Sequence, residues 1–134
     1  MIISTRSQYG LRAMVFLAKN RGKILPLKEI SKKEDISLDY LEKIISKLKK
    51  VGLVKAKKGI GGGYFLTKKP SKIKIGQIIR PLDGEFSLVK CIAKNKKAIC
   101  SKERKCLTKK FWKKMKKSLD SALDSITLSD LLKK

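Results

Sequence analysis

The chain has 134 residues, the size of one compact domain with a short extension. It carries 35 Lys and Arg against 11 Asp and Glu, which gives a formal net charge of +24, and it contains no histidine. Such a charge attracts polyanions such as nucleic acids, although a surface that simply uses lysine as its default residue would show it as well. The lack of histidine excludes Cys/His zinc fingers, histidine general bases and catalytic triads of the usual make-up.

The sequence also bears on location. No apolar run approaches the roughly 20 residues that a membrane-spanning helix needs. The first residues lack the ordered basic and apolar regions of a signal peptide, so we expect a cytoplasmic protein with no membrane partner. Three cysteines in a reducing compartment argue against a disulfide framework and leave metal binding or redox chemistry open.

The first third of the chain predicts two helices. Ser4 or Thr5 can cap a helix that runs to about Lys19. Residues 24–26 are expected to be extended, because proline disfavours helix in the residue before it. A short helix follows over residues 27–34, with a turn after it.

Residues 36–66 give the clearest pattern. Apolar residues recur there at three- and four-residue steps, as one face of a helix requires: Leu38, Leu41, Ile44, Ile45 and Leu48. Ser37 is a good N-cap for this helix and Gly52 can end it. A strand over residues 53–56, a glycine-rich basic tip and a strand over residues 64–66 follow. Two short helices and a two-stranded wing predict a winged helix-turn-helix, in which the polar face of the second helix can enter a major groove.

The rest of the chain is predicted to be mostly helical. One or two helical turns are expected over residues 75–82, stopping near Pro81. Between residues 87 and 105 the apolar residues follow neither the helical nor the strand spacing, so no helix or strand is predicted there. A long helix is expected over residues 107–123, where apolar residues recur every four positions opposite a lysine-rich side, and a last turn or two over residues 126–132.

These elements predict a mainly α fold with a small β-wing. We expect a winged helix-turn-helix DNA-binding domain at residues 1–83, a cysteine-bearing loop at residues 84–106, and a dimerisation helix with a C-terminal tail at residues 107–134. The apolar stripe of the long helix could instead pack only on its own domain. DNA-binding proteins commonly bind two half-sites, which favours a symmetric dimer through this helix.

The assembled pattern resembles the Rrf-two family of bacterial winged-helix transcription regulators over nearly the whole chain. The ordered set of matching pieces comprises residues 4–13, 36–42, 52–54, 61–64, 106–108 with Trp112, and 126–128. The resemblance implies a DNA-binding regulator and not an enzyme, acting as a homodimer on a palindromic operator in double-stranded DNA. It also implies that the helix from Ser37 to Lys50 lies in the major groove and that the wing lies near the minor groove.

The same resemblance assigns candidate DNA contacts. They are Ser37, Asp39, Glu42, Lys43, Lys58 and Gly59. A glutamate can accept a hydrogen bond from the amino group of cytosine, and lysine can donate to guanine. Each of these side chains could instead be merely solvated, and Asp39 could act only on the dipole of its own helix.

Cys91, Cys100 and Cys106 are candidate metal ligands. They are separated by eight and five residues in a lysine-rich segment, which favours the thiolate form that iron–sulfur clusters bind. Family members that hold a cluster carry three cysteines here, so the resemblance implies a [4Fe–4S] or [2Fe–2S] cluster that senses iron, redox state or nitric oxide.

The fourth ligand of such a cluster is unknown. The family's histidine position is Lys109 here, and its carboxylate position on the first helix is Gln8. Water, a small thiol or Glu103 could fill the site, or it could be open. The alternatives are a zinc site with an outside ligand, and a cluster-free repressor controlled by thiol redox, a small ligand or a protein partner.

Overall fold

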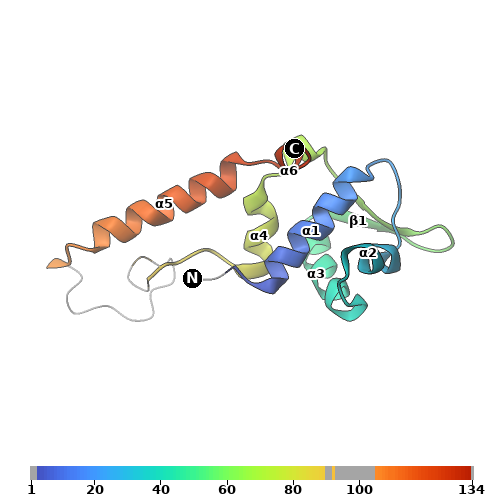
Figure 1. Ribbon diagram of the computed structural model, residues 1–134, viewed down its shortest axis with the longest axis horizontal. Coiled ribbons are helices and arrows are strands. Elements are labelled where there is room, and N and C mark those ends of the chain that lie inside the picture. The colour runs from blue at the N-terminus through green and yellow to red at the C-terminus, as the bar shows by residue number, and fades with distance from the viewer. Residues whose placement is uncertain (1–2, 90–91, 93–104, 134) are drawn as a thin grey trace.

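The computed structural model describes residues 3–89, 92 and 105–133. Three helices open the chain: α1 (Thr5–Lys19), α2 (Leu27–Glu34) and α3 (Leu38–Lys50). The hairpin of β1 (Val54–Lys57) and β2 (Gly63–Leu66) follows, with the short 3-10 helix η1 (Pro70–Lys72) after it. Helices α4 (Ile75–Asp83), α5 (Lys109–Ser125) and α6 (Leu128–Leu131) complete the fold. Figure 1 shows α5 projecting from one end of the helical body and the hairpin from the other.

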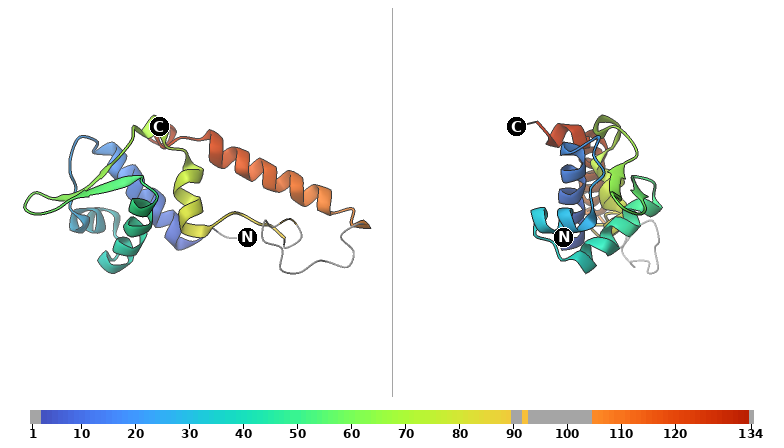
Figure 2. Two further views of the ribbon diagram at one scale, coloured as in Figure 1. Left: turned by 180° about the vertical axis from the view of Figure 1, so that it is seen from behind. Right: turned by 90° about the vertical axis from the view of Figure 1, so that its right-hand side faces the viewer.

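The hydrophobic core joins α1, α3 and α4. Met14 of α1, Ile44 of α3 and Ile78 of α4 are each at most 1% exposed and belong to one cluster. Leu128 of α6 enters the same cluster and is fully buried, so the C-terminal residues return to the body (Figure 2). Because the inner face of α3 is held from several sides, its outer face is presented to solvent in a fixed orientation.

The wing is anchored at its base. Strands β1 and β2 are antiparallel, with Val54 opposite Leu66 and Lys57 opposite Gly63. The backbone of Tyr64 exchanges two hydrogen bonds with Leu25, with N···O distances of 3.0 and 2.7 Å. The extended segment after α1 therefore holds the wing. The first strand begins one residue later than predicted, because the N–H of Leu53 donates to the carbonyl of Leu48 at the end of α3.

Helix α4 ends one residue later than predicted. It runs through Pro81 and stops at Asp83, two residues after the proline. Proline removes one hydrogen bond from a helix interior, but Ile78, Ile79 and Leu82 of this helix are buried. That packing outweighs the lost bond and keeps the last turn helical.

Helix α5 starts at Lys109, two residues later than predicted, and none of its residues is buried. Leu107 before it is 93% exposed and Phe111 within it is 54% exposed. Its C-terminal end is attached to the body, where the N–H of Ile75 donates to the carbonyl of Ile126 at 2.9 Å. Among the described residues, no helix combines the length and the apolar character needed to cross a bilayer.

Candidate nucleic-acid interface

Helix α3 separates its residues cleanly into two faces. Leu41, Ile44, Ile45 and Leu48 are buried, whereas Asp39, Glu42 and Lys43 are exposed. Ser37 caps the helix, since its hydroxyl oxygen accepts from the N–H of Tyr40 at 3.3 Å. The hydroxyl hydrogen of Ser37 is not used by that bond and can be donated to another group. Four of the predicted contact residues thus lie together on the solvent side of α3 or at its start.

An arginine from another helix lies beside this face. Arg6 of α1 lines an open hollow of about 580 Å³ together with Glu42, Lys43 and Lys47 of α3. The sequence pattern does not indicate this role for Arg6, because nothing local signals that the start of α1 lies next to the middle of α3. The outer face of α3 therefore includes a cation that sequence reasoning missed.

Aromatic and charged contacts hold α1 against the helix-turn-helix. The rings of Tyr9 and Tyr40 meet edge to face with centroids 5.7 Å apart. The guanidinium of Arg12 lies 5.5 Å from the Tyr9 ring centre, and its Nη2 is 3.6 Å from a carboxylate oxygen of Glu34. Cation–π and edge-to-face contacts are directional, so they help to fix the angle at which α3 is presented.

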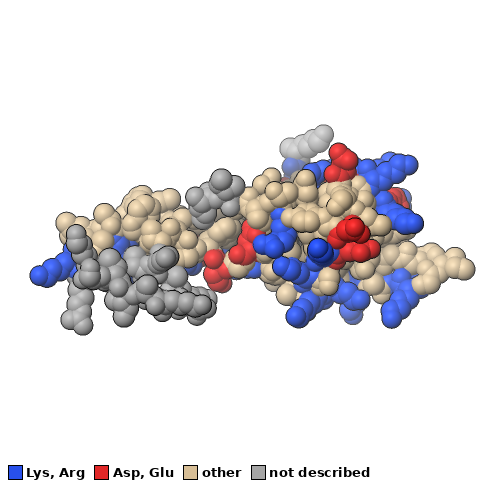
Figure 3. All heavy atoms as spheres, turned by 90° about the horizontal axis from the view of Figure 1, so that it is seen from below, with Lys and Arg blue, Asp and Glu red and all other residues tan. Residues whose placement is uncertain are grey.

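The wing supplies the other part of the predicted interface. Lys58 and Gly59 lie in the loop between the two strands, and both are exposed. Lys55 and Lys57 on β1 are exposed as well. Figure 3 shows Lys and Arg side chains gathered over the winged half of the molecule on the face seen from below. This distribution gives the winged half a positive field.

The start of α1 is fixed by a carboxylate of α4. The hydroxyl of Ser7 donates to Oδ2 of Asp83 at 2.6 Å, and both the hydroxyl and the backbone N–H of Ser4 donate to the same carboxylate. Arg6 Nη2 lies 3.8 Å from Oδ1. Burial alone would raise the pKa of Asp83, but these hydrogen bonds and the charge of Arg6 outweigh it and hold the pKa below its ordinary value.

We expect Asp83→Asn to lower the free energy of unfolding by about 1–3 kcal/mol at pH 7, because the serine hydroxyls lose a charged acceptor. A carboxylate whose pKa is lowered by folding stabilises the protein above its unfolded pKa of about 4 and loses that contribution as the pH falls through the folded pKa. The gap between wild type and variant should therefore shrink below pH 4, as urea unfolding at several pH values would measure. Glu42→Gln, further along the exposed face of α3 and past its first turn, is the control, and a gap independent of pH would contradict this account.

Only one of the three candidate metal ligands lies in the described part of the chain. Cys91 and Cys100 fall outside it, while Cys106 is half-buried just before α5. The Sγ of Cys106 lies 3.0 Å from Oγ1 of Thr108. This hydroxyl, together with the backbone N–H groups of Thr108 and Lys109 and the charge of Lys109, lowers the pKa of the Cys106 thiol. Within the described ranges no three His, Cys, Asp or Glu residues are grouped to hold a metal.

Thiolate is the form that binds iron, so the surroundings of Cys106 fit a metal ligand. The two candidate positions for a fourth ligand are also placed. Lys109 is the first residue of α5, and the side-chain amide of Gln8 donates to the carbonyl of Ile3 at 3.0 Å.

Comparison with known proteins identifies the family. The family Rrf2, described as an iron-dependent transcriptional regulator, matches residues 3–134. The chain belongs to the Rrf2 family. The prediction of a DNA-binding transcription regulator that is not an enzyme is therefore confirmed.

Proteins named IscR and proteins named CymR are both similar to this chain. The HTH-type transcriptional regulator IscR of Aliivibrio salmonicida is 37% identical over 134 residues, covering 98% of this chain and 77% of the relative. The structure of T. potens IscR is 41% identical, with a TM-score of 0.78 over 99% of this chain and 87% of that one. CymR (YrzC), the global cysteine regulator of B. subtilis, is 36% identical, with a TM-score of 0.81 over 98% and 95%. These likenesses confirm the winged helix-turn-helix with a long C-terminal helix.

Proposed function

We propose that this Rrf2 regulator acts as a homodimer on a palindromic operator, with α3 of each protomer in the major groove and each wing near the minor groove. The observation that carries the proposal is the division of α3, whose apolar side is fully packed while its polar side faces solvent. A rigid helix with an uncovered polar face suits reading of base edges. Residues 1–83 form the DNA-binding part in this proposal.

Each exposed residue has a role that its chemistry allows. Glu42 accepts from a cytosine amino group, and Lys43 donates to guanine acceptors. Ser37 donates its hydroxyl hydrogen to a phosphate at the N-terminus of α3, where the helix dipole favours negative charge. Asp39 is the weakest candidate because its charge also favours that dipole. Lys58 contacts a phosphate beside the minor groove, and Gly59 lets the backbone come close.

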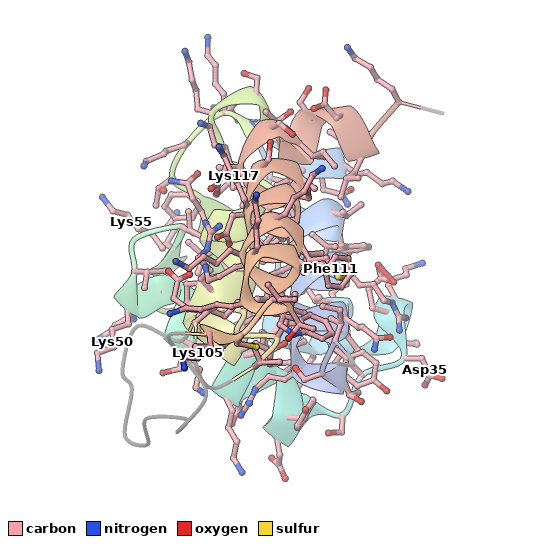
Figure 4. The ribbon with its side chains drawn as sticks, turned by 90° about the vertical axis from the view of Figure 1, so that its left-hand side faces the viewer. Asp35, Lys50, Lys55, Lys105, Phe111 and Lys117 are labelled. Carbon is pink, nitrogen blue, oxygen red and sulfur yellow. The ribbon has the colours of Figure 1, made fainter. Side chains whose placement is uncertain are left out.

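The proposed dimer uses α5 and the tail, residues 107–134. Phe111 and Met115 lie on one side of α5, exposed by 54% and 38%, and Leu107 and Ile126 flank the helix with large exposed fractions. In Figure 4, which looks along α5, Phe111 and Lys117 lie on different sides of the helix. A twofold copy packed on the apolar side would bury that surface and place two α3 helices for two half-sites.

We further propose that Cys91, Cys100 and Cys106, in the segment 84–106 and its end, hold an iron–sulfur cluster of the [4Fe–4S] or [2Fe–2S] type. The likeness to IscR and the lowered pKa of the Cys106 thiol support this assignment. A bound cluster would make the protein responsive to iron supply, redox state or nitric oxide. Since Cys106 directly precedes the dimerisation helix, a change at the thiol would shift the two reader helices relative to each other and change operator affinity.

A cluster-free regulator is the second candidate. The likeness to CymR, described as a global cysteine regulator, favours it, and a partly exposed thiol with a lowered pKa also suits redox control. Oxygen-free purification separates the two candidates. Protein with stoichiometric iron and sulfide would support the cluster, whereas protein that stays colourless after attempted reconstitution would support control by thiols, a ligand or a partner.

Selection of binding sites from random duplex DNA tests the DNA proposal, and a palindrome should be enriched. On that operator we expect Lys58→Ala to weaken binding and to lower the magnitude of the salt slope by about one, because one phosphate contact is lost. Titrations by fluorescence anisotropy at several salt concentrations would measure both. Lys133→Ala, in the C-terminal tail, is the matched control. An unchanged slope for Lys58→Ala would show that the wing does not contact phosphate through this residue.

A further inference from the structure

The tip of the wing carries an unusual side chain. Ile60 is 106% exposed, more than any other large apolar residue in the described part of the chain. A single exposed apolar side chain is common on protein surfaces and by itself indicates nothing. Its position is what matters, because Ile60 lies at the far end of the element proposed to approach the minor groove.

The turn directs Ile60 outward. The carbonyl of Gly59 accepts from the N–H of Gly62 at 3.0 Å, so residues 59–62 form a β-turn with Ile60 and Gly61 at its corners. Gly61 has a φ of +74°, the value that the third residue of a type II turn requires and that glycine adopts without strain. Glycine therefore takes the corner that needs a positive φ, and the isoleucine side chain at the other corner is fully exposed to solvent.

Charge surrounds this apolar tip without reaching it. Lys55 and Lys57 are exposed on β1 and Lys58 is exposed where the loop begins, whereas residues 59–63 carry no charge. Figure 3 shows the same arrangement, with an uncharged tip at the right edge and Lys and Arg closer to the body. Phosphates line both rims of a DNA groove and base edges form its floor. The lysines of the wing can therefore contact the phosphates at the rims while the apolar tip contacts the base edges at the floor.

We propose that Ile60 enters the minor groove and selects A·T over G·C pairs where the wing lies on the operator. The proposal rests on the proposed function, in which the wing lies near that groove. The minor-groove edge of an A·T pair presents only acceptors, whereas a G·C pair adds the 2-amino group of guanine. That group projects into the minor groove and would lose its water partners beneath an alkyl side chain placed there. Architectural proteins insert apolar side chains into the same groove.

Inosine gives a sharp test, because an I·C pair lacks only the 2-amino group and keeps the major-groove pattern of G·C. On the selected operator, each A·T pair under the wing is replaced by G·C and then by I·C. We expect wild type to lose about fivefold or more in affinity on G·C, the usual cost of one wrong pair, and to recover on I·C. Ile60→Ser, which removes no packing contact, should bind all three duplexes alike with an unchanged salt slope.

The controls separate this inference from its premise. Lys58→Ala should weaken binding to all three duplexes equally while it keeps their order. If Ile60→Ser keeps the wild-type preference, groove shape sensed by the lysines explains the selection, and the role of Ile60 is wrong. If wild type binds tightly but treats G·C and A·T alike, only this inference fails. If wild type enriches no site from random duplex DNA, the proposed function is wrong, and this inference is wrong as well.

Discussion

Phe111→Glu is expected to disrupt the proposed homodimer and to abolish high-affinity binding to the proposed operator. Phe111 is 54% exposed on α5 and its ring meets that of Trp112 edge to face, with centroids 4.9 Å apart. In a twofold dimer the substitution places a carboxylate in the apolar interface from each protomer. Loss of one buried aromatic contact alone costs about 1.5–3 kcal/mol, and burying an unpaired charge adds to it. Dimer affinity should therefore fall by about two orders of magnitude or more.

Analytical ultracentrifugation of free protein and binding to whole and half operators would measure this effect. The matched control is Ser121→Glu, which makes the same charge change one helical turn beyond Lys117 on the basic side of α5. It should leave the dimer intact. If Phe111→Glu remains dimeric at the concentrations where wild type does, the interface lies elsewhere. If the variant is monomeric but still binds the whole operator as tightly as wild type, dimerisation is not needed for operator binding.

The reader helix and the wing could be predicted from sequence because their determinants are local. The three- and four-residue spacing of Leu41, Ile44, Ile45 and Leu48 marks one buried face, and the structure buries all four. The glycine-rich tip between two short apolar segments likewise gives a hairpin. Periodicity also found α5, although its start differs by two residues because the apolar pattern extends past the helix to Leu107.

Contacts between distant segments could not be predicted in this way. Arg80 of α4 binds Asp124 of α5 through two hydrogen bonds of 2.6 and 3.1 Å and also reaches Asp120 at 3.3 Å. Hydrogen bonds from Arg80 to Asp124 and Asp120 outweigh the effect of burial and raise the pKa of the guanidinium, which stays charged. No spacing pattern predicts a pair 44 residues apart. The burial of Leu128 and the place of Arg6 beside α3 were missed for the same reason.

These long-range contacts connect the proposed cluster site to the proposed DNA-reading helix α3. Cys106 lies just before α5, and α5 is joined to α4 by Arg80. Helix α4 packs on α3 through the core that contains Ile78 and Ile44. A shift at the start of α5 can therefore reach α3 through elements that are packed against each other, as rigid-body switching requires.

Cys106→Ala is expected to remove most of the iron from protein purified without oxygen and to change its operator affinity. Three thiolates are the proposed ligands, and a cluster deprived of one of them is held by two. Cys91→Ala and Cys100→Ala should behave in the same way. Iron and sulfide assays with an absorbance spectrum would measure the loss, and anisotropy titrations would measure the affinity. If all three variants bind the operator as the iron-loaded wild type does, sensing through these cysteines is wrong, although DNA binding stands.

Thr108→Val tests whether the hydroxyl beside Cys106, and not only the thiol, is needed to lower the thiol pKa and retain iron. It keeps Cys106 but removes the hydroxyl that lies 3.0 Å from Sγ, and the Thr108 side chain makes no capping bond to α5, so the fold should be unaffected. In a Cys91→Ala/Cys100→Ala background, the pH dependence of alkylation by iodoacetamide reports the pKa of Cys106 alone. We expect that pKa to rise in Thr108→Val, and the otherwise native variant to lose iron faster than wild type. An unchanged alkylation profile would show that the hydroxyl does not stabilise the thiolate, and iron retention would then have to depend on the other two cysteines and the fourth ligand.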